Sequence, residues 1–312
     1  MRKPLRNALG LLLVVCSGFY IYRILGDSLD QVRRAHYSIT IGAWIWLTLG
    51  SLGTLILSTF YHVLATRRIE PGTVPATKIG LAYALGQIVR YVPGKVIGVL
   101  FQIKFLSGKL RAATITLALI VQTIYDYLWT ITFAATILLC ATSASLWPLA
   151  VLLPISLGVW WAHKQGWCER ALMFPGLIQR LLPQVQQAHL SKPPHAGLAT
   201  LLLVGEWLPL LLGISIALNG IFGLSDALLL GAVYLLAAVG SLLVIVVPSG
   251  LVVREALFVW LGSRYGFEPA MLLFLGLILR VAMTFAEALN VVVFLAADAV
   301  HGRFGSKRLL PD

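Results

Sequence analysis

The sequence predicts an all-α integral membrane protein, a polytopic helical bundle with almost no soluble part. Of its 312 residues, 59% are hydrophobic and 12% are charged, whereas a typical soluble domain has about 25% charged residues. The mean hydropathy is +0.89. Residues 127–163 and 227–253 contain no Lys, Arg, Asp or Glu, and an uncharged apolar run of about 18 residues or more is typical of a transmembrane helix. This composition excludes most soluble-enzyme and nucleic-acid-binding classes, despite a net charge of +12.

Apolar segments follow one another along the chain, and we expect six to eight membrane spans. The segments are 8–25, 39–65, 79–103, 112–140, 146–163, 196–219, 227–262 and 269–298. The first segment follows a basic N-terminus but lacks a small-x-small cleavage site, so we interpret it as a retained span and not as a signal peptide. Residues 1–312 are expected to form a single transmembrane domain.

The basic residues divide unequally between the loops and predict the topology. Loops 220–226 and 141–145 hold no basic residue, and 26–38 and 263–268 hold three between them, whereas 16 of the 24 basic residues lie in 1–7, 66–78, 104–111, 164–195 and the tail after 298. Because cytoplasmic loops carry an excess of Lys and Arg, both termini are predicted to be cytoplasmic, in a multi-pass protein of the plasma (inner) membrane. The net charge then reflects topology and contact with anionic lipid. The loop 164–195 mixes Trp, Leu and Phe with basic and amide residues, which predicts an amphipathic segment on the cytoplasmic leaflet.

Two of the apolar segments are interrupted by proline and glycine. Segment 79–103 lies between two basic loops, so it must begin and end on the cytoplasmic side, and Pro93 and Gly94 interrupt it near its middle. Proline removes a helical hydrogen bond and glycine permits a turn. The first arm is about 21 Å long, shorter than a hydrocarbon core of about 30 Å, which predicts a re-entrant hairpin. Pro248 and Gly250 interrupt segment 227–262, and the charge pattern leaves open whether this hairpin is re-entrant or fully spanning.

The order of segments is the same in the two halves of the chain. Each half contains span, span, broken hairpin and span, and the second half starts on the opposite side of the membrane. This order predicts inverted-topology repeats, residues 1–140 and 146–298, which commonly hold a substrate near the midplane between interrupted helices. The alternative is that the two interruptions are ordinary kinks, because Pro and Gly are frequent in membrane helices.

Ionisable residues at membrane depth are candidates for function because burying a charge there is costly. They are Arg90, Lys95, Asp126, Glu206, Arg254, Glu255, Arg280 and Glu287. Four are acidic and four basic, so the alternative is that they pair with one another for structural reasons. We expect Asp126, Glu206, Arg280 and Glu287 to be charge partners, and Asp126 could equally be a proton carrier. Arg280 and Glu287 lie two turns apart on one helix face and should meet partners on neighbouring helices.

The basic residues beside the two interruptions suggest an anion site. Arg90 and Lys95 flank the first interruption, and Arg254 and Glu255 follow the second. A broken helix exposes unpaired N–H groups and a positive dipole end, and Arg and Lys add full charges that bind phosphate. We therefore expect Arg90, Lys95, Arg254 and Glu255 to form a lipid-headgroup site, in which the acid competes for the bases to release the anion. The anion would belong to a membrane phospholipid or to a polyprenyl phosphate.

Two motifs carry a resemblance to a known family. RYVPGK (residues 90–95) and PSGLVVREA (residues 248–256) resemble the signature segments of the flippase-like transmembrane domain of lysylphosphatidylglycerol synthases and its stand-alone relatives. The resemblance extends along the chain in segment order and implies a flippase for a lipid or a lipid-linked sugar. The matching positions are Arg90, Pro93, Gly94, Lys95, Pro248, Gly250, Arg254 and Glu255. The soluble synthase domain is absent from the sequence, so synthesis of a lysyl-lipid is not expected.

Enzymatic motifs are missing from the sequence. It contains no HExxH, no GxxxxGK[ST] and no GxSxG, so we expect no catalytic activity, no cofactor and no metal. Two alternatives to a flippase remain. One is a polyprenyl-phosphate-dependent glycosyltransferase, for which Asp27 and Asp30 are the only close acidic pair in an external loop. The other is a non-catalytic partner subunit that presents lipid to a membrane glycosyltransferase or a lipid-modifying enzyme.

Overall fold

The structure, a computed structural model, describes the chain in several stretches. These are residues 39–72, 74–89, 97–143, 145, 147–167, 196–219, 221–242 and 253–307. The predictions for the first span, for the two proline–glycine interruptions and for most of the loop 164–195 fall outside the described residues. Arg90, Pro93, Gly94, Lys95, Pro248 and Gly250 are among the residues concerned.

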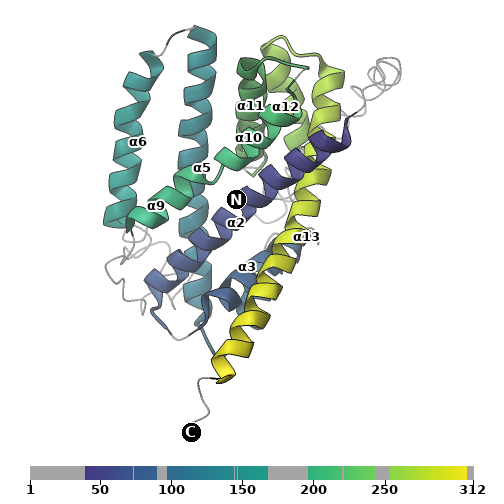
Figure 1. Cartoon of the computed structure of the whole chain (residues 1–312). Coiled ribbons are helices and arrows are strands. Elements are labelled where there is room, and N and C mark those ends of the chain that lie inside the picture. The colour runs from purple at the N-terminus through teal and green to yellow at the C-terminus, as the bar shows by residue number, and fades with distance from the viewer. Residues whose placement is uncertain are drawn as a thin grey trace, which may run out of the picture.

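The described chain is helical and contains no β-strand. Its helices, labelled in Figure 1 where there is room, are α2 (Ile41–Ile69), α3 (Ala76–Val89), α4 (Ile97–Phe105), α5 (Ala112–Ser143), α6 (Trp147–Gln165), α9 (Ala196–Gly205), α10 (Leu208–Ala217), α11 (Leu224–Leu242), α12 (Val253–Arg264) and α13 (Pro269–Lys307). In Figure 1, α2 runs obliquely to α5, and α13 extends along the length of the bundle.

The helices confirm the prediction of a polytopic helical membrane protein. Five stretches of the described chain are long and apolar enough to cross a membrane: Ile41–Ile69, Ala112–Ser143, Gly197–Ala217, Leu224–Ser241 and Pro269–His301. Large apolar side chains are exposed along them, as with Leu201 at 71% and Phe285 at 62%. Water-soluble proteins rarely expose extended apolar surfaces, so these side chains face lipid.

Local signals in the sequence explain several helix ends. The Thr40 hydroxyl accepts a hydrogen bond of 3.2 Å from the amide of Ala43 and caps the start of α2, as expected of an N-cap threonine. Pro269 occupies the first position of α13, where its missing N–H costs nothing. Gly266, between α12 and α13, has a φ of +86°, a conformation that only glycine adopts without strain.

The apolar segment 196–219 contains one candidate membrane span, Gly197–Ala217, and this span is interrupted by a turn. α9 ends at Gly205, Glu206 and Trp207 form a turn, and α10 begins at Leu208. Pro209 lies in the first turn of α10, and it cannot donate a hydrogen bond to the carbonyl of Gly205 four residues earlier. The span is therefore interrupted, and a glutamate lies at the interruption.

Helices α2 and α10 approach each other closely through a pair of glycines. A Cβ added to Gly50 would lie 2.5 Å from the carbonyl oxygen of Pro209, and one added to Gly213 would lie 2.6 Å from the carbonyl oxygen of Trp46. Only hydrogen side chains allow the two backbones to come this near, as in other membrane helix pairs that use small residues.

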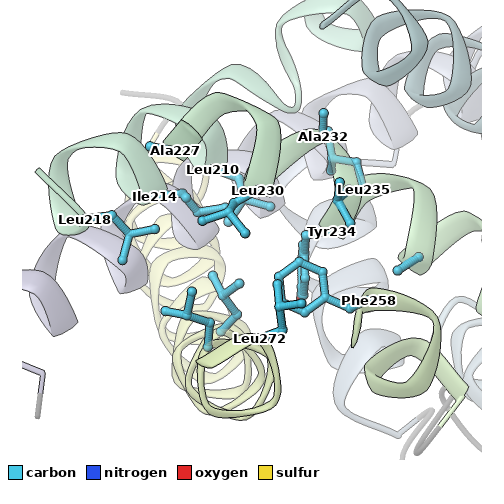
Figure 2. Packing of buried hydrophobic residues seen from close by; sticks show 14 of the residues in the cluster. Leu210, Ile214, Leu218, Ala227, Leu230, Ala232, Tyr234, Leu235, Phe258 and Leu272 are labelled. Carbon is cyan, nitrogen blue, oxygen red and sulfur yellow. The ribbon is translucent and has the colours of Figure 1, made fainter. Parts of the chain in front are cut away.

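The main hydrophobic cluster joins the second half of the chain. Figure 2 shows Leu210 and Ile214 of α10, and Leu218 just after it, beside residues of α11, α12 and α13. The rings of Tyr234 and Phe258 meet edge to face, with their centroids 5.5 Å apart, a favourable geometry for an aromatic pair. This packing fixes α11 and α12, which flank residues 243–252, against α13.

The helices of the two halves pack in corresponding ways. α3 contacts α4 across the undescribed residues 90–96, and α11 contacts α12 across residues 243–252. α3 also packs against α13, the last helix of the second half, and α11 packs against α5, the last helix of the first half. The pair α3–α4 therefore packs against the second half of the chain, and the pair α11–α12 packs against the first half.

Basic loops meet at one end of the bundle. At the end of α2, the Glu70 carboxylate accepts a hydrogen bond of 3.2 Å from the Arg111 amide, at the start of α5. The Thr77 hydroxyl, at the start of α3, donates a 2.9 Å hydrogen bond to Asp298 of α13. The loops 66–78 and 104–111 thus lie beside the end of α13, at the lower end in Figure 1, which is consistent with the basic loops sharing one side of the membrane.

Candidate functional site: a polar cavity between two interrupted helix pairs

A cavity of about 350 Å³ lies inside the bundle and is lined by many polar side chains. Its wall contains residues that flank both interruptions. Gln87, near the end of α3, and Gly98, the second residue of α4, lie on either side of residues 90–96. Ser241, near the end of α11, and Arg254, the second residue of α12, lie on either side of residues 243–252. The described flanks of the two sequence motifs are therefore brought to one cavity.

Two helix N-termini abut this cavity. Gly98 lies in the first turn of α4 and Arg254 in the first turn of α12, and both residues line the wall. The first N–H groups of a helix lack partners within the helix and carry partial positive charge. Arg254 adds a guanidinium to this part of the wall, and both guanidinium groups and helix N-termini can bind phosphate.

Arg254 is held by an aromatic ring and by a shared carboxylate. Its guanidinium lies 5.2 Å from the centroid of the Tyr234 ring, within the range of a cation–π contact. Its Nη2 donates to Oε1 of Glu255 at 3.4 Å, and Nη1 of Arg280 donates to the same oxygen at 2.8 Å. Glu255 is buried. The three side chains together carry one net positive charge, and Arg254 brings its guanidinium to the cavity wall.

Arg280 of α13 forms an ion pair with Glu255 of the neighbouring helix α12. Glu287, two turns further along α13, is 1% exposed and lies outside the residues that line the cavity. One turn further again, Asn290 donates a 3.1 Å hydrogen bond from Nδ2 to the hydroxyl of Thr59 on α2. This part of α13 is therefore a buried polar contact with α2.

Asp126 also lies in the cavity wall. Its side chain accepts hydrogen bonds from two neutral groups. The indole Nε1 of Trp207 donates to Oδ1 of Asp126 at 3.0 Å, and the Thr130 hydroxyl donates to the same oxygen at 3.3 Å. All three residues line the cavity. Trp207 belongs to the turn between α9 and α10, so this interruption, like the other two, delivers a side chain to the site.

Glu206 lies next to Trp207 in the same turn and is 3% exposed. The hydroxyl of Ser58 is near enough to hydrogen-bond its carboxyl group, and the carboxyl group of Asp126 interacts with it electrostatically. Its Oε2 atom has no hydrogen-bond partner among the residues that the structure describes. Two acidic side chains from different helices thus lie close together beside the cavity.

A network of neutral polar groups joins the cavity to α2. The side-chain amide of Gln122 donates from Nε2 to the hydroxyls of Ser58 and Tyr83 at 3.0 and 3.1 Å. Its Oε1 lies 2.8 Å from Nδ1 of His62, whose ring stacks on that of Tyr83 with the centroids 4.4 Å apart. The network fixes Gln122 one helical turn before Asp126 and so holds this stretch of the cavity wall.

One acceptor in the wall is left unsatisfied within the described part of the chain. Gln102 of α4 is 3% exposed, lines the cavity, and its Oε1 has no hydrogen-bond partner there. A buried carbonyl without a donor costs about 1–3 kcal/mol. A ligand with a hydroxyl or amine donor, or an ordered water molecule, would recover this cost.

Metal binding finds no support in the described residues, which contain no group of three or more His, Cys, Asp or Glu side chains that could hold an ion. Comparison of the chain with protein-family models and with curated protein sequences finds no match.

Proposed function

We propose that this chain is a translocase for a lipid or a lipid-linked sugar in the plasma (inner) membrane, with both termini cytoplasmic. The observation that carries the proposal is the cavity whose wall holds Arg254 and the first turns of α4 and α12. Arg90 and Lys95, from the undescribed first motif, are proposed to complete the headgroup site with Glu255. The resemblance of both motifs to the flippase-like domain of lysylphosphatidylglycerol synthases supports the same function.

The packing supports the proposed inverted repeats. In a structure with a two-fold axis, contacts are reciprocal: if residue i of one half touches residue j of the other, the equivalent contact recurs with the halves exchanged. Gly50 meets the backbone at Pro209 and Gly213, and Gly213 meets the backbone at Trp46 and Gly50. The packing of α3 on α13 and of α11 on α5 follows the same rule. Inverted repeats give a transporter two related conformations, open to opposite sides of the membrane.

The chemistry of the cavity supports an amphiphilic substrate with an anionic head. Arg254 and two helix N-termini would bind the phosphate, while Gln102, Asp126 and Tyr127 offer partners to further polar groups of the head. The helices around the cavity expose large apolar side chains, so the acyl or prenyl chains would remain in the bilayer during transport. We propose no catalytic step for this site.

Reconstitution into liposomes tests the proposal. Purified protein is incorporated with a fluorescent phosphatidylglycerol or with a fluorescent polyprenyl-phosphate lipid, and a membrane-impermeant quencher reports the fraction of probe in the outer leaflet. We expect one of these probes to exchange between leaflets faster than in protein-free liposomes, and we expect Arg254→Gln to slow the exchange. Exchange at the protein-free rate for both probes would refute the proposal.

The same assay separates the alternatives. A new glycolipid formed after addition of a sugar donor would indicate the glycosyltransferase. Activity that appears only when a co-purified membrane enzyme is present would indicate a subunit that presents lipid to that enzyme.

A further inference from the structure

The partly exposed Asp126 and the buried Glu206 form an acidic pair that the headgroup site does not require. Asp126 comes from the middle of α5 and Glu206 from the turn between α9 and α10. Trp207 connects them, because its indole donates to Asp126 at 3.0 Å and its backbone adjoins Glu206. The two carboxyl groups interact electrostatically, and Ser58, a residue of the cavity wall, is near enough to hydrogen-bond Glu206.

The surroundings of the pair do not favour two negative charges. Within the described residues, the hydrogen-bond donors that contact Asp126 are a neutral indole and a neutral hydroxyl, and Oε2 of Glu206 has no hydrogen-bond partner there. Arg254 reaches the cavity, but it also binds Glu255, which Arg280 binds as well. Two neighbouring carboxyl groups in a largely buried site cannot both ionise readily, which favours a proton shared between them.

The other titratable groups around the pair are accounted for on each packed element. They are His62 of α2, Tyr83 of α3, Tyr127 of α5, His163 of α6, Tyr234 of α11 and Arg254 of α12. His62 is bound to Gln122, and His163 is bound to Tyr61 and Thr200. Among the residues that the structure describes, the two carboxyl groups are therefore the exchangeable acids nearest the cavity. On α13, Arg280 is paired with Glu255, and neither Arg280 nor Glu287 lines the cavity.

Building on the proposed function, we propose that Asp126 and Glu206, which share one proton in the empty site, take up a second proton that travels with the anionic headgroup. The proton is taken from water in the cavity by a carboxylate of the pair and returned to water on the other side of the membrane, so no covalent bond other than O–H is made or broken. An anion bound near Arg254 adds negative charge beside the pair and favours its protonation. By thermodynamic reciprocity, protonation of the pair strengthens binding of the anion by the same factor.

This coupling predicts the direction of the pH dependence. Where the pair gains one proton on binding, affinity for the anionic headgroup falls about tenfold for each unit of rising pH above the titration of the empty site. A pH gradient across the membrane would then drive the lipid towards the more alkaline side, where the proton is released.

Infrared spectroscopy tests the shared proton without any lipid. The wild type in detergent at neutral pH should show the carbonyl stretch of a protonated carboxyl group, and Asp126→Asn with Glu206→Gln should remove it. Asp226→Asn, which changes an exposed carboxyl group in the first turn of α11, is the matched control and should leave the band unchanged. If the spectra of the wild type and the double variant show the same protonated-carboxyl signal, or neither shows one, the inference is overturned.

Calorimetry then tests the coupling. Binding of a short-chain phosphatidylglycerol is measured in two buffers of different ionisation enthalpy, which gives the number of protons taken up. We expect up to one proton per lipid for the wild type and for Asp226→Asn, and none for the double variant, whose binding should lose its pH dependence. Lipid binding by the wild type without proton uptake would overturn this inference and leave the proposed translocase intact, whereas liposomes without lipid exchange would refute the translocase itself.

Discussion

Gly50 of α2 and Gly213 of α10 face each other, with a Cβ added to Gly213 only 3.1 Å from the Cα of Gly50. Each glycine also approaches a backbone carbonyl four residues before its counterpart, at Pro209 and at Trp46. Backbone atoms cannot rotate away as a side chain can. The contact therefore sets the separation of the two helices and, through them, the spacing of the two halves.

Replacing Gly50 with Ala should destabilise the bundle. The added methyl group meets backbone oxygen at 2.5 Å, and overpacking of this kind costs about 1–3 kcal/mol. Thermal unfolding in detergent should show a lower Tm for Gly50→Ala. Gly158→Ala is the matched control, because Gly158 lies in α6 with nothing within 4 Å of its added Cβ, and alanine is the better helix former. Equal Tm values for both variants would contradict the close contact.

Neutralising the bases of the proposed headgroup site should weaken lipid binding. A hydrogen bond to a charged group is worth about 1.5–3 kcal/mol, so Arg254→Gln or Lys95→Gln should lower apparent affinity for an anionic lipid about tenfold or more. Arg264→Gln, at the exposed end of the same helix as Arg254, should bind as the wild type does. Fluorescence titration with phosphatidylglycerol in detergent measures the affinity. Wild-type affinity in well-folded Gln variants at both positions would eliminate this headgroup site.

Glu255 should contribute to stability as well as to the site. Glu255→Gln leaves Arg254 and Arg280 without the carboxylate that both now share, and breaking a buried ion pair costs about 3–5 kcal/mol. Its Tm should fall, and adding Arg280→Gln should restore part of the loss because one of the unpaired charges is removed. A double variant that unfolds at a lower temperature than Glu255→Gln alone would show that the pair does not act as a unit.

The contact between Glu70 and the start of α5 should weaken in acid. Partial burial favours the neutral carboxyl group, but hydrogen bonds from Thr114 and the Arg111 amide, with the charge of Arg111, outweigh it and lower the pKa of Glu70. The charged form then stabilises the fold above the unfolded-state pKa of about 4.3, and this stabilisation is lost as the pH falls through the folded-state pKa.

Glu70→Gln should therefore lower the Tm at neutral pH, and the difference from the wild type should shrink as the pH drops below about 4. Thermal unfolding of both proteins from neutral pH to below pH ~4 measures this difference in Tm. Glu268→Gln, an exposed acid before α13, is the control. A Tm difference for Glu70→Gln that stays constant down to the acid limit would rule out the charge as its cause.

The topology predicts that residues 68 and 109 are accessible from the same side of the membrane. The Glu70–Arg111 contact holds their loops together at one end of the bundle. Single cysteines at these positions, in a background without Cys16, Cys140 and Cys168, should both react with an impermeant maleimide from the cytoplasmic side. A cysteine at position 145, in the loop between α5 and α6, should react from the opposite side. Labelling of 68 and 109 from different sides would refute the first hairpin.

The helical membrane class was predictable because composition and charge are averages over long segments. Hydropathy marks each apolar stretch, and the basic loops mark one side of the membrane. The interruption between α9 and α10 was not predicted, since Pro209 alone is compatible with a kinked but continuous helix. The turn at Glu206 and Trp207 depends on how α10 fits against α2, which is a tertiary contact.

The site was predictable only in its charged residues. Arg254 and Glu255 stand out because charge is rare in an apolar segment, whereas Gln102, Trp207 and His62 are neutral and do not. These three come from α4, from the turn before α10 and from α2, so only the packing of separate helices brings them together. The glutamines are the feature of the sequence that could have indicated these neutral residues. Gln87, Gln102 and Gln122 each interrupt an otherwise apolar stretch, and all three line the cavity.

The interruption at Glu206 also bears on how the chain enters the bilayer. Residues Gly197–Ala217 form a 21-residue stretch of high hydropathy with a single acidic residue. The penalty for one central carboxylate, about 2.5–3.5 kcal/mol, is offset by leucines worth about 0.3–0.6 kcal/mol each. During synthesis, the insertion machinery would therefore accept this stretch as one ordinary helix. The turn would form afterwards, when α10 packs against Gly50 and Trp207 forms its hydrogen bond with Asp126. Asp126 and Glu206 would therefore come together only after the helices have packed.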